Sequence, residues 1–199
     1  MSQLSCANRV VFVVAGPPAV GKTAILGELQ RAAADTARGQ VSSTFSIDQI
    51  LLDLHCAGRL RVASRITTDG ALFVDDFLAV ASECLDQLLT AIHAAEGVVL
   101  VELPLFDHEI YPAFLDIFRC AHVLILRAPL DTRILRNRHR RGREIPEQAL
   151  REMQQMAGMD AQRLIVCAAA SVTHLDTDGS FEKVKNFATA WLKEKLVPG

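Results

Sequence analysis

The residues best suited to chemistry begin with the loop Gly16 to Thr23, which reads GPPAVGKT. It fits the pattern G-x-x-x-x-G-K-[ST], and it lies between an apolar run and a helix-forming segment. In such loops, backbone N–H groups surround a phosphate, the lysine reaches the terminal phosphates and the last hydroxyl holds Mg²⁺. The pattern therefore predicts a phosphate-binding loop in which Lys22 contacts the phosphates and Thr23 binds the metal.

Two residues of this loop, Pro17 and Pro18, have no N–H to offer a phosphate. They lie in the first half of the loop, whereas the donors are needed in its second half, so we expect phosphate binding to be retained. The residues expected to contact the nucleotide share a place in the loop or in the first turn after it. They are Gly16, Ala19, Val20, Gly21, Lys22, Thr23 and Ala24.

Two carboxylates are expected at the ends of neighbouring strands. Asp48 follows the short run STFSI, and Glu102 closes the apolar run GVVLVE. An acceptor hydroxyl needs a nearby carboxylate that orients it and takes its proton, so Asp48 is the candidate base. Glu102 is expected to hold Mg²⁺ through water or to bind the acceptor. Either carboxylate could act as the base, and Asp48 could also cap the helix that follows it.

An arginine-rich segment, RILRNRHRRGRE, follows a later apolar run. Arginine binds phosphate oxygens in a bidentate manner, so a mobile segment of this kind could close over a nucleotide and stabilise a phosphoryl group in transfer. We expect Arg138 and Arg141 to act in catalysis and Arg143 to contact the nucleotide, whereas Arg133 and Arg136 could be structural. A basic face that binds RNA is the alternative.

The elements that position these residues alternate between apolar β-branched runs and amphipathic segments, which indicates an α/β fold. We expect strands at about 10–14, 43–47, 97–102, 122–128 and 171–176, and helices on both faces of the sheet. One long helix is expected over 72–95 and another over 146–166. The three-layer arrangement has five parallel strands, whose carboxyl ends carry every polar feature described above.

Length and composition limit the kind of protein. The 199 residues fit one domain, 1–199, with a lid at about 133–150. No apolar run approaches the roughly 20 residues of a membrane span, and no signal sequence is evident, which predicts a cytoplasmic protein. The five cysteines are spread singly, and the net charge of −2 makes nucleic-acid binding an improbable general property. The oligomeric state is not indicated.

The class of nucleotide-binding protein can be narrowed by what the sequence lacks. A GTPase needs an Asp-x-x-Gly element after its third strand and an Asn-Lys-x-Asp element that reads the base. The segment DTDG at 176–179 fits the first by its letters, but it follows the last strand, and no Asn-Lys-x-Asp is present. The length favours a small-molecule kinase.

With these residues placed, the chain resembles the P-loop small-molecule kinases of the nucleoside-monophosphate-kinase-like superfamily, and most of all dephospho-coenzyme A kinase. The segments FSIDQILLDL, VVLVELPLFDHEIY, HVLILRAPLDTRILRNR and IPEQALREMQQM carry this likeness. Glu102 and the arginine-rich segment also resemble uridine and deoxynucleoside kinases. The resemblance implies the P-loop NTPase fold with strand order 2-3-1-4-5 and a helical lid.

The expected activity is therefore the transfer of the γ-phosphoryl group of ATP, with Mg²⁺, to a hydroxyl of a small nucleotide-like metabolite. Dephospho-coenzyme A is the favoured acceptor, and a nucleoside is the alternative. A regulatory or RNA-associated nucleotide-binding protein remains a different class of possibility, in which the arginines would serve a polyanion.

Overall fold

A computed structural model of the chain describes residues 9–36, 42–66, 72–74, 78–105, 115–119, 121–140, 144–155 and 159–196. Its strands are β1 (Arg9–Gly16), β2 (Ser42–Ser46), β3 (Ser64–Ile66), β4 (Leu72–Val74), β5 (Gly97–Pro104), β6 (Ala121–Arg127) and β7 (Ser171–Asp176). Its helices are α1 (Lys22–Thr36), α2 (Ile47–Cys56), α3 (Leu78–Ala94), α4 (Leu115–Phe118), α5 (Leu130–Arg138), α6 (Glu147–Gln155), α7 (Met159–Ala168) and α8 (Phe181–Leu196).

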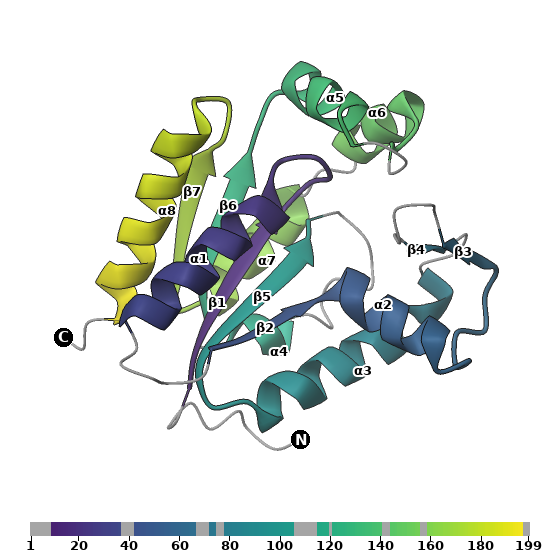
Figure 1. The fold of residues 1–199 in the computed structure, drawn as a ribbon, viewed down its shortest axis with the longest axis horizontal. Helices are drawn as coiled ribbons and strands as arrows, with labels where there is room; N and C mark the ends of the chain where they lie inside the picture. The colour runs from purple at the N-terminus through teal and green to yellow at the C-terminus, as the bar shows by residue number, and fades with distance from the viewer. Residues whose placement is uncertain are drawn as a thin grey trace.

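Five parallel strands form the central sheet in the order β2-β5-β1-β6-β7. Counted along the chain without the short β3 and β4, this is the order 2-3-1-4-5, so the predicted topology is confirmed. The register places Ser46 beside Glu102 and Val14 beside Glu102 from the other side. The end of β5 and the loop after β1 therefore lie at the same edge of the sheet (Figure 1).

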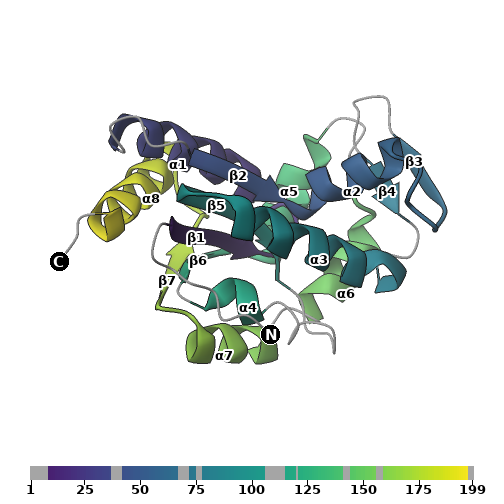
Figure 2. The same cartoon turned by 90° about the horizontal axis from the view of Figure 1, so that it is seen from below.

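Helices cover both faces of this sheet, as Figures 1 and 2 show. The strand β1 explains why, because its side chains alternate between two apolar clusters. Phe12 and Val14 pack with buried residues of α1 and α8, whereas Val11 and Val13 pack with those of α2, α3, α4 and α7. Each fully buried large side chain contributes about 1.5–3 kcal/mol, so a strand that faces two cores has to be apolar throughout.

The segment 72–95 differs from the single long helix that the sequence predicts. Leu72–Val74 is strand β4, which pairs antiparallel with β3, and the helix α3 begins only at Leu78. Leu72 and Val74 are two residues apart, and both pack against the core to which α3 also contributes. Apolar residues at this short spacing are compatible with a strand as well as with a helix. Within α3 the four-residue spacing holds, since Val80, Cys84, Leu88 and Ile92 are buried.

The segment 146–166 is also divided. Two helices, α6 and α7, replace the one that was expected, and residues 156–158 between them lie outside the described part of the chain. The helix α6 packs with α5, whereas α7 packs with β7 and α4. The arginine-bearing helix α5 and its neighbour α6 therefore stand together beyond the carboxyl ends of the strands (Figure 1).

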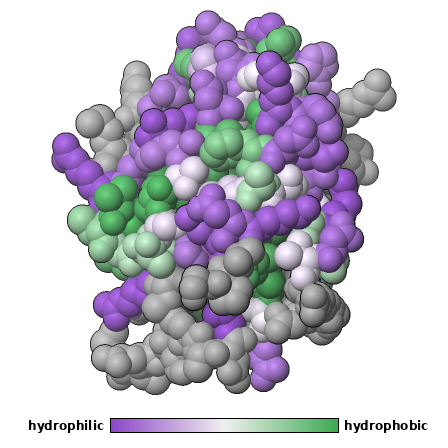
Figure 3. Space-filling view, turned by 90° about the vertical axis from the view of Figure 1, so that its left-hand side faces the viewer, coloured by the Kyte–Doolittle hydropathy of each residue, from purple (hydrophilic) through white to green (hydrophobic). Residues whose placement is uncertain are grey.

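The outer face on the side of α8 carries apolar side chains in small separate areas among hydrophilic ones (Figure 3). Phe181 and Phe187 of α8 are about half exposed, which is ordinary for isolated apolar residues at a protein surface. Among the described residues, no helix is both long and apolar enough to cross a membrane.

Candidate nucleotide-binding and phosphoryl-transfer site

The loop after β1 has the backbone of a tight turn around its second half. Gly21 has φ +103°, which only glycine adopts without strain, and Ala19 has φ +59°, the one positive φ of a non-glycine residue among those described. A Cβ atom at Gly16 would lie 2.9 Å from the backbone oxygen of Leu126 and 2.9 Å from Cγ1 of Val20. The first glycine is therefore fixed by close packing and the second by backbone conformation.

Lys22 is half-buried at the start of α1, and its ammonium donates a hydrogen bond to the carbonyl oxygen of Pro17 at 3.2 Å. Burial lowers the pKa of Lys22, and the nearby carboxylates of Glu102 and Asp48 oppose that change, whereas Arg140 and Arg133 add to it. The prolines that supply no N–H thus supply a carbonyl, which holds the lysine beside the loop. The same electrostatic relations show that both predicted carboxylates lie near Lys22.

The first carboxylate, Glu102, accepts a hydrogen bond from the Thr23 hydroxyl, with 3.2 Å between Oγ1 and Oε1. Burial is the main reason that the pKa of Glu102 is raised, while the positive charge of Lys22 acts in the opposite direction. A hydroxyl and a carboxylate are hard oxygen ligands of the kind that Mg²⁺ prefers, so this pair fits the metal. Among the described residues there is no cluster of three or more His, Cys, Asp or Glu side chains that could hold a metal ion.

The second carboxylate, Asp48, is exposed in the first turn of α2, one residue beyond the strand end that the sequence predicts. Its charge raises the pKa of both Lys22 and Glu102. The possibility that Asp48 caps this helix is wrong, because Ser46 is the N-cap and its hydroxyl accepts the N–H of Gln49 at 3.1 Å. The Asp48 side chain is therefore not occupied as the helix cap.

Two arginines of α5 lie behind the loop and bind its carbonyl oxygens. Arg133 is fully buried and donates to the carbonyl of Pro18 at 3.5 Å and to Oε1 of Gln154 at 2.6 Å. Arg136 donates to the carbonyl of Val20 at 3.2 Å. Both guanidinium groups thus connect α5 to the loop rather than extending into solvent.

Thr177 is a buried contact of the same loop that sequence reasoning missed. Its hydroxyl lies 3.0 Å from the carbonyl oxygens of Val20 and Arg127 and accepts a hydrogen bond from Arg136 at 3.0 Å. Arg136 also donates to the Thr177 carbonyl. The segment 176–179, which resembles a GTPase element only by its letters, therefore supports the phosphate loop. A small polar residue directly after the last apolar strand was the available signal.

The remaining arginines lie at the end of α5 and in the segment that follows it. Arg138 is exposed and pairs with Glu147 at 3.2 Å, whereas Arg140 lies close enough to Lys22 and Glu102 to affect the pKa of both. Arg133 and Arg136 lie three residues apart on α5, whereas Arg140 follows the end of this helix, so helical spacing gives no signal that identifies Arg140. Arg141 and Arg143 lie outside the described residues.

Comparisons with known proteins support the fold. No model of a known protein family matches the sequence, and no curated protein matches it. Among solved structures, a gluconokinase from Sinorhizobium meliloti 1021 is 16% identical with a TM-score of 0.56, over 94% of this chain and 93% of that one.

Two further structures lead to the same result. The tunicamycin resistance protein of Deinococcus radiodurans is 18% identical with a TM-score of 0.59, over 96% of this chain and 99% of that one. A shikimate kinase from Acinetobacter baumannii, solved in complex with shikimate, is 15% identical with a TM-score of 0.51, over 98% and 97% of the two chains. The chain therefore has the α/β fold of the P-loop NTPases, which it shares with solved small-molecule kinases.

Proposed function

We propose that this protein is an ATP- and Mg²⁺-dependent kinase that phosphorylates a hydroxyl group of a small metabolite. The observation that carries the proposal is the 3.2 Å hydrogen bond between Thr23 and Glu102, formed beside Lys22. It brings the metal-binding hydroxyl of the phosphate loop and a strand-end acid to one point. Asp48 lies close enough to affect the same groups, so an acceptor hydroxyl and a terminal phosphate could meet there.

In the proposed reaction, backbone N–H groups of the loop from Ala19 to Ala24 bind the phosphates of ATP, and Gly16 and Gly21 allow the close approach. Lys22 leaves the Pro17 carbonyl and binds the terminal phosphates. Thr23 and Glu102 would hold Mg²⁺, which supplies positive charge that stabilises the phosphates. Asp48 accepts the proton of the acceptor hydroxyl as its oxygen bonds to the γ-phosphorus and the bond to ADP breaks.

The arginine-rich segment is proposed as a lid at about 133–150 within one domain of residues 1–199. Arg140 is added to the predicted pair Arg138 and Arg141 as a residue that stabilises the transferring phosphoryl group, because its charge already acts on Lys22. The contacts of Arg133 and Arg136 with loop carbonyls support a kinase over an RNA-binding protein. Arginines that face inward are not available to a polyanion.

The acceptor is best found by a screen that measures ADP release with one candidate at a time. Dephospho-coenzyme A and nucleosides are included because the sequence resembles their kinases. Gluconate and shikimate are included because the names of two solved kinases with this fold point to them. Acceptor-dependent ADP formation with one compound, together with its phosphorylated product, would establish the activity.

The role of the base is tested by Asp48→Asn with Asp53→Asn as its matched control. Both aspartates are exposed on α2, and Asp53 accepts a hydrogen bond from Gln49 at 2.9 Å and has no role in the proposal. We expect Asp48→Asn to lower kcat by about 10²–10⁴-fold while ATP affinity is retained, and Asp53→Asn to resemble the wild type. An unchanged kcat in Asp48→Asn would remove Asp48 from this role.

A further inference from the structure

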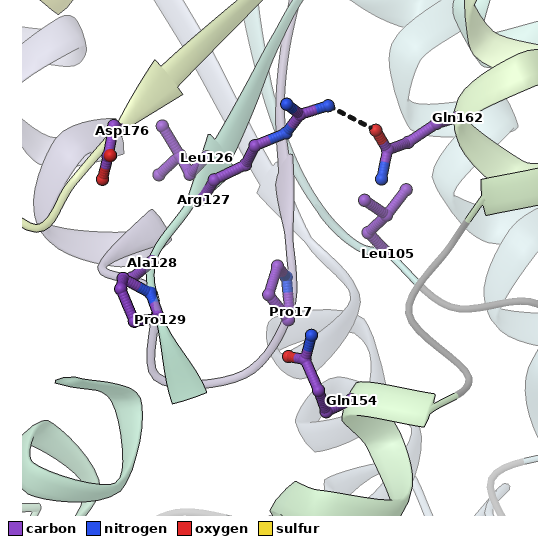
Figure 4. Close-up of a pocket in the computed structure, with 9 residues that line it drawn as sticks. All are labelled: Pro17, Leu105, Leu126, Arg127, Ala128, Pro129, Gln154, Gln162 and Asp176. Carbon is purple, nitrogen blue, oxygen red and sulfur yellow. Dashed lines mark hydrogen bonds between the residues drawn. The ribbon is translucent and has the colours of Figure 1, made fainter. Parts of the chain in front are cut away.

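A cavity of about 320 Å³ lies next to the phosphate loop, at the carboxyl ends of β6 and β7. Its polar lining comes from Arg127, Gln154, Gln162 and Asp176, and Pro17 and Pro129 are among its apolar walls. In Figure 4 the side chains of Arg127 and Gln162 lie on one side and that of Gln154 on another, with Pro17 between them. The cavity thus lies between β6, β7, α6, α7 and the first half of the phosphate loop.

Both glutamines of the cavity are oriented by arginines. Arg127 donates to Oε1 of Gln162 at 2.7 Å, and Arg133 donates to Oε1 of Gln154 at 2.6 Å. Since each amide oxygen already accepts a hydrogen bond, each amide offers its NH₂ group to a ligand. Arg127 has further N–H groups besides the one that binds Gln162. The polar groups of the cavity are therefore mainly hydrogen-bond donors.

The positive charges of two arginines near the cavity favour an anion, as the hydrogen-bond donors do. Arg133, which contacts the lining residue Gln154, is 0% exposed, and among the described residues it forms no ion pair and its Nε has no hydrogen-bond partner. Arg127, which lines the cavity directly, is exposed, and it forms no ion pair within the described part of the chain. A buried positive charge without a counter-charge costs free energy, which a bound anion would offset.

One lining group opposes an anion, namely the carboxylate of Asp176. Its Oδ1 accepts the backbone N–H of Asp178 at 2.9 Å, so one of its oxygens is already used in the turn after β7. Asp176 and Arg127 are both exposed, so water screens these two opposite charges alike, whereas the charge of the buried Arg133 is screened less. The balance of donors and charges therefore favours an oxygen-rich anion over a cation.

We infer that this cavity is a second ligand site, separate from the site for the phosphates of ATP, and that it binds a carboxylate or phosphate group of a small molecule. Arg127 and the amide groups of Gln154 and Gln162 contact the oxyanion, and Arg133 acts through Gln154. The inference does not depend on phosphoryl transfer, because every group in it is a binding group.

The test is isothermal titration calorimetry of the full chain without nucleotide or Mg²⁺, with succinate, inorganic phosphate and the neutral polyol sorbitol as probes at matched ionic strength. We expect saturable binding of at least one anion and none of sorbitol. Arg127→Gln should weaken that binding about 10–100-fold, the loss of hydrogen bonds to a charged group. Gln162→Leu should weaken it less.

Two control variants distinguish binding at the cavity from binding at the phosphate loop and from an effect of the overall charge of the protein. Lys22→Met removes the ammonium of the loop and should leave binding to the cavity within about twofold of the wild type. Arg31→Gln removes the same charge as Arg127→Gln from an exposed position on α1, where Arg31 pairs with Glu28, and should have no effect.

The probe that binds identifies the source of the oxyanion: succinate alone indicates a carboxylate, phosphate alone a phosphate group, and both a site that accepts either. The inference is overturned by the absence of saturable binding of both anions, by an unchanged affinity in Arg127→Gln, or by loss of binding in Lys22→Met.

Discussion

Replacing Thr177 with valine removes one buried hydroxyl and keeps the branched shape of the side chain. Thr177 is 3% exposed, and its Oγ1 lies 3.0 Å from the carbonyl oxygens of Val20 and Arg127 and from NH1 of Arg136. The variant therefore loses one bond accepted from a charged donor and one bond donated to a carbonyl. It creates no cavity.

The magnitude follows from these two bonds. A hydrogen bond to a charged group contributes about 1.5–3 kcal/mol and a neutral one about 0.5–1.5 kcal/mol. Arg136 and the Thr177 N–H still bind the carbonyls of Val20 and Arg127, so no polar group is left without a partner. We expect Thr177→Val to lower the free energy of unfolding by about 2–4.5 kcal/mol, which corresponds to a fall in Tm of about 4–18 °C.

The assay is urea denaturation followed by circular dichroism, with Thr90→Val as the control. The hydroxyl of Thr90 donates to the carbonyl of Asp86 at 2.7 Å on the exposed side of α3, so this variant should change stability by less than about 0.5 kcal/mol. If Thr177→Val were no more destabilising than Thr90→Val, Thr177 would not support the loop in the way that its contacts indicate.

Three other predictions concern the same loop and its acid. Gly16→Ala should lower the free energy of unfolding by about 1–3 kcal/mol, because its Cβ would lie 2.9 Å from the backbone oxygen of Leu126. An unchanged Tm in thermal unfolding would show that β1 and β6 can move apart at this point with no loss of stability. Ala19→Gly should relieve about 1–2 kcal/mol of strain at φ +59° and lose about 0.5–1 kcal/mol to backbone entropy, so denaturation should show equal or slightly higher stability. Burial raises the pKa of Glu102 above its usual 4.5, so between these two values the folded state binds more protons than the unfolded chain. The free energy of unfolding should therefore fall as the pH rises from 4.5 towards the pKa of the folded state. Glu102→Gln should remove this fall when stability is measured against pH, and a curve identical to that of the wild type would contradict the prediction.

The sheet and its order could be predicted because the strands that flank the loop are buried on both faces and therefore read as apolar runs. β5 is the clearest case, since five of its eight residues are buried and Glu102 interrupts the run where the chemistry begins. The positions of Lys22, Thr23 and Glu102 followed from that order, because parallel strands end at a common edge. The sequence pattern was sufficient there.

The contacts that support the loop could not be read in the same way. Thr177, Arg133 and Arg136 contact the loop through backbone carbonyls, and carbonyls have no side-chain signature. The ribbon of β3 and β4 was missed because three-residue strands are shorter than the window over which a period can be recognised.

The bond between Thr177 and Val20 spans 157 positions of the chain, and it has a consequence for how the protein is synthesised. The central strand β1 pairs with β5 and β6, both of which leave the ribosome long after it does. A nascent chain can therefore form the turn of the loop early and gain the contacts of Arg133 and Arg136 later, but the contact with Thr177 forms only when residue 177 has emerged. Nucleotide affinity measured on stalled chains of increasing length should rise late, so ATP binding would report that folding is complete.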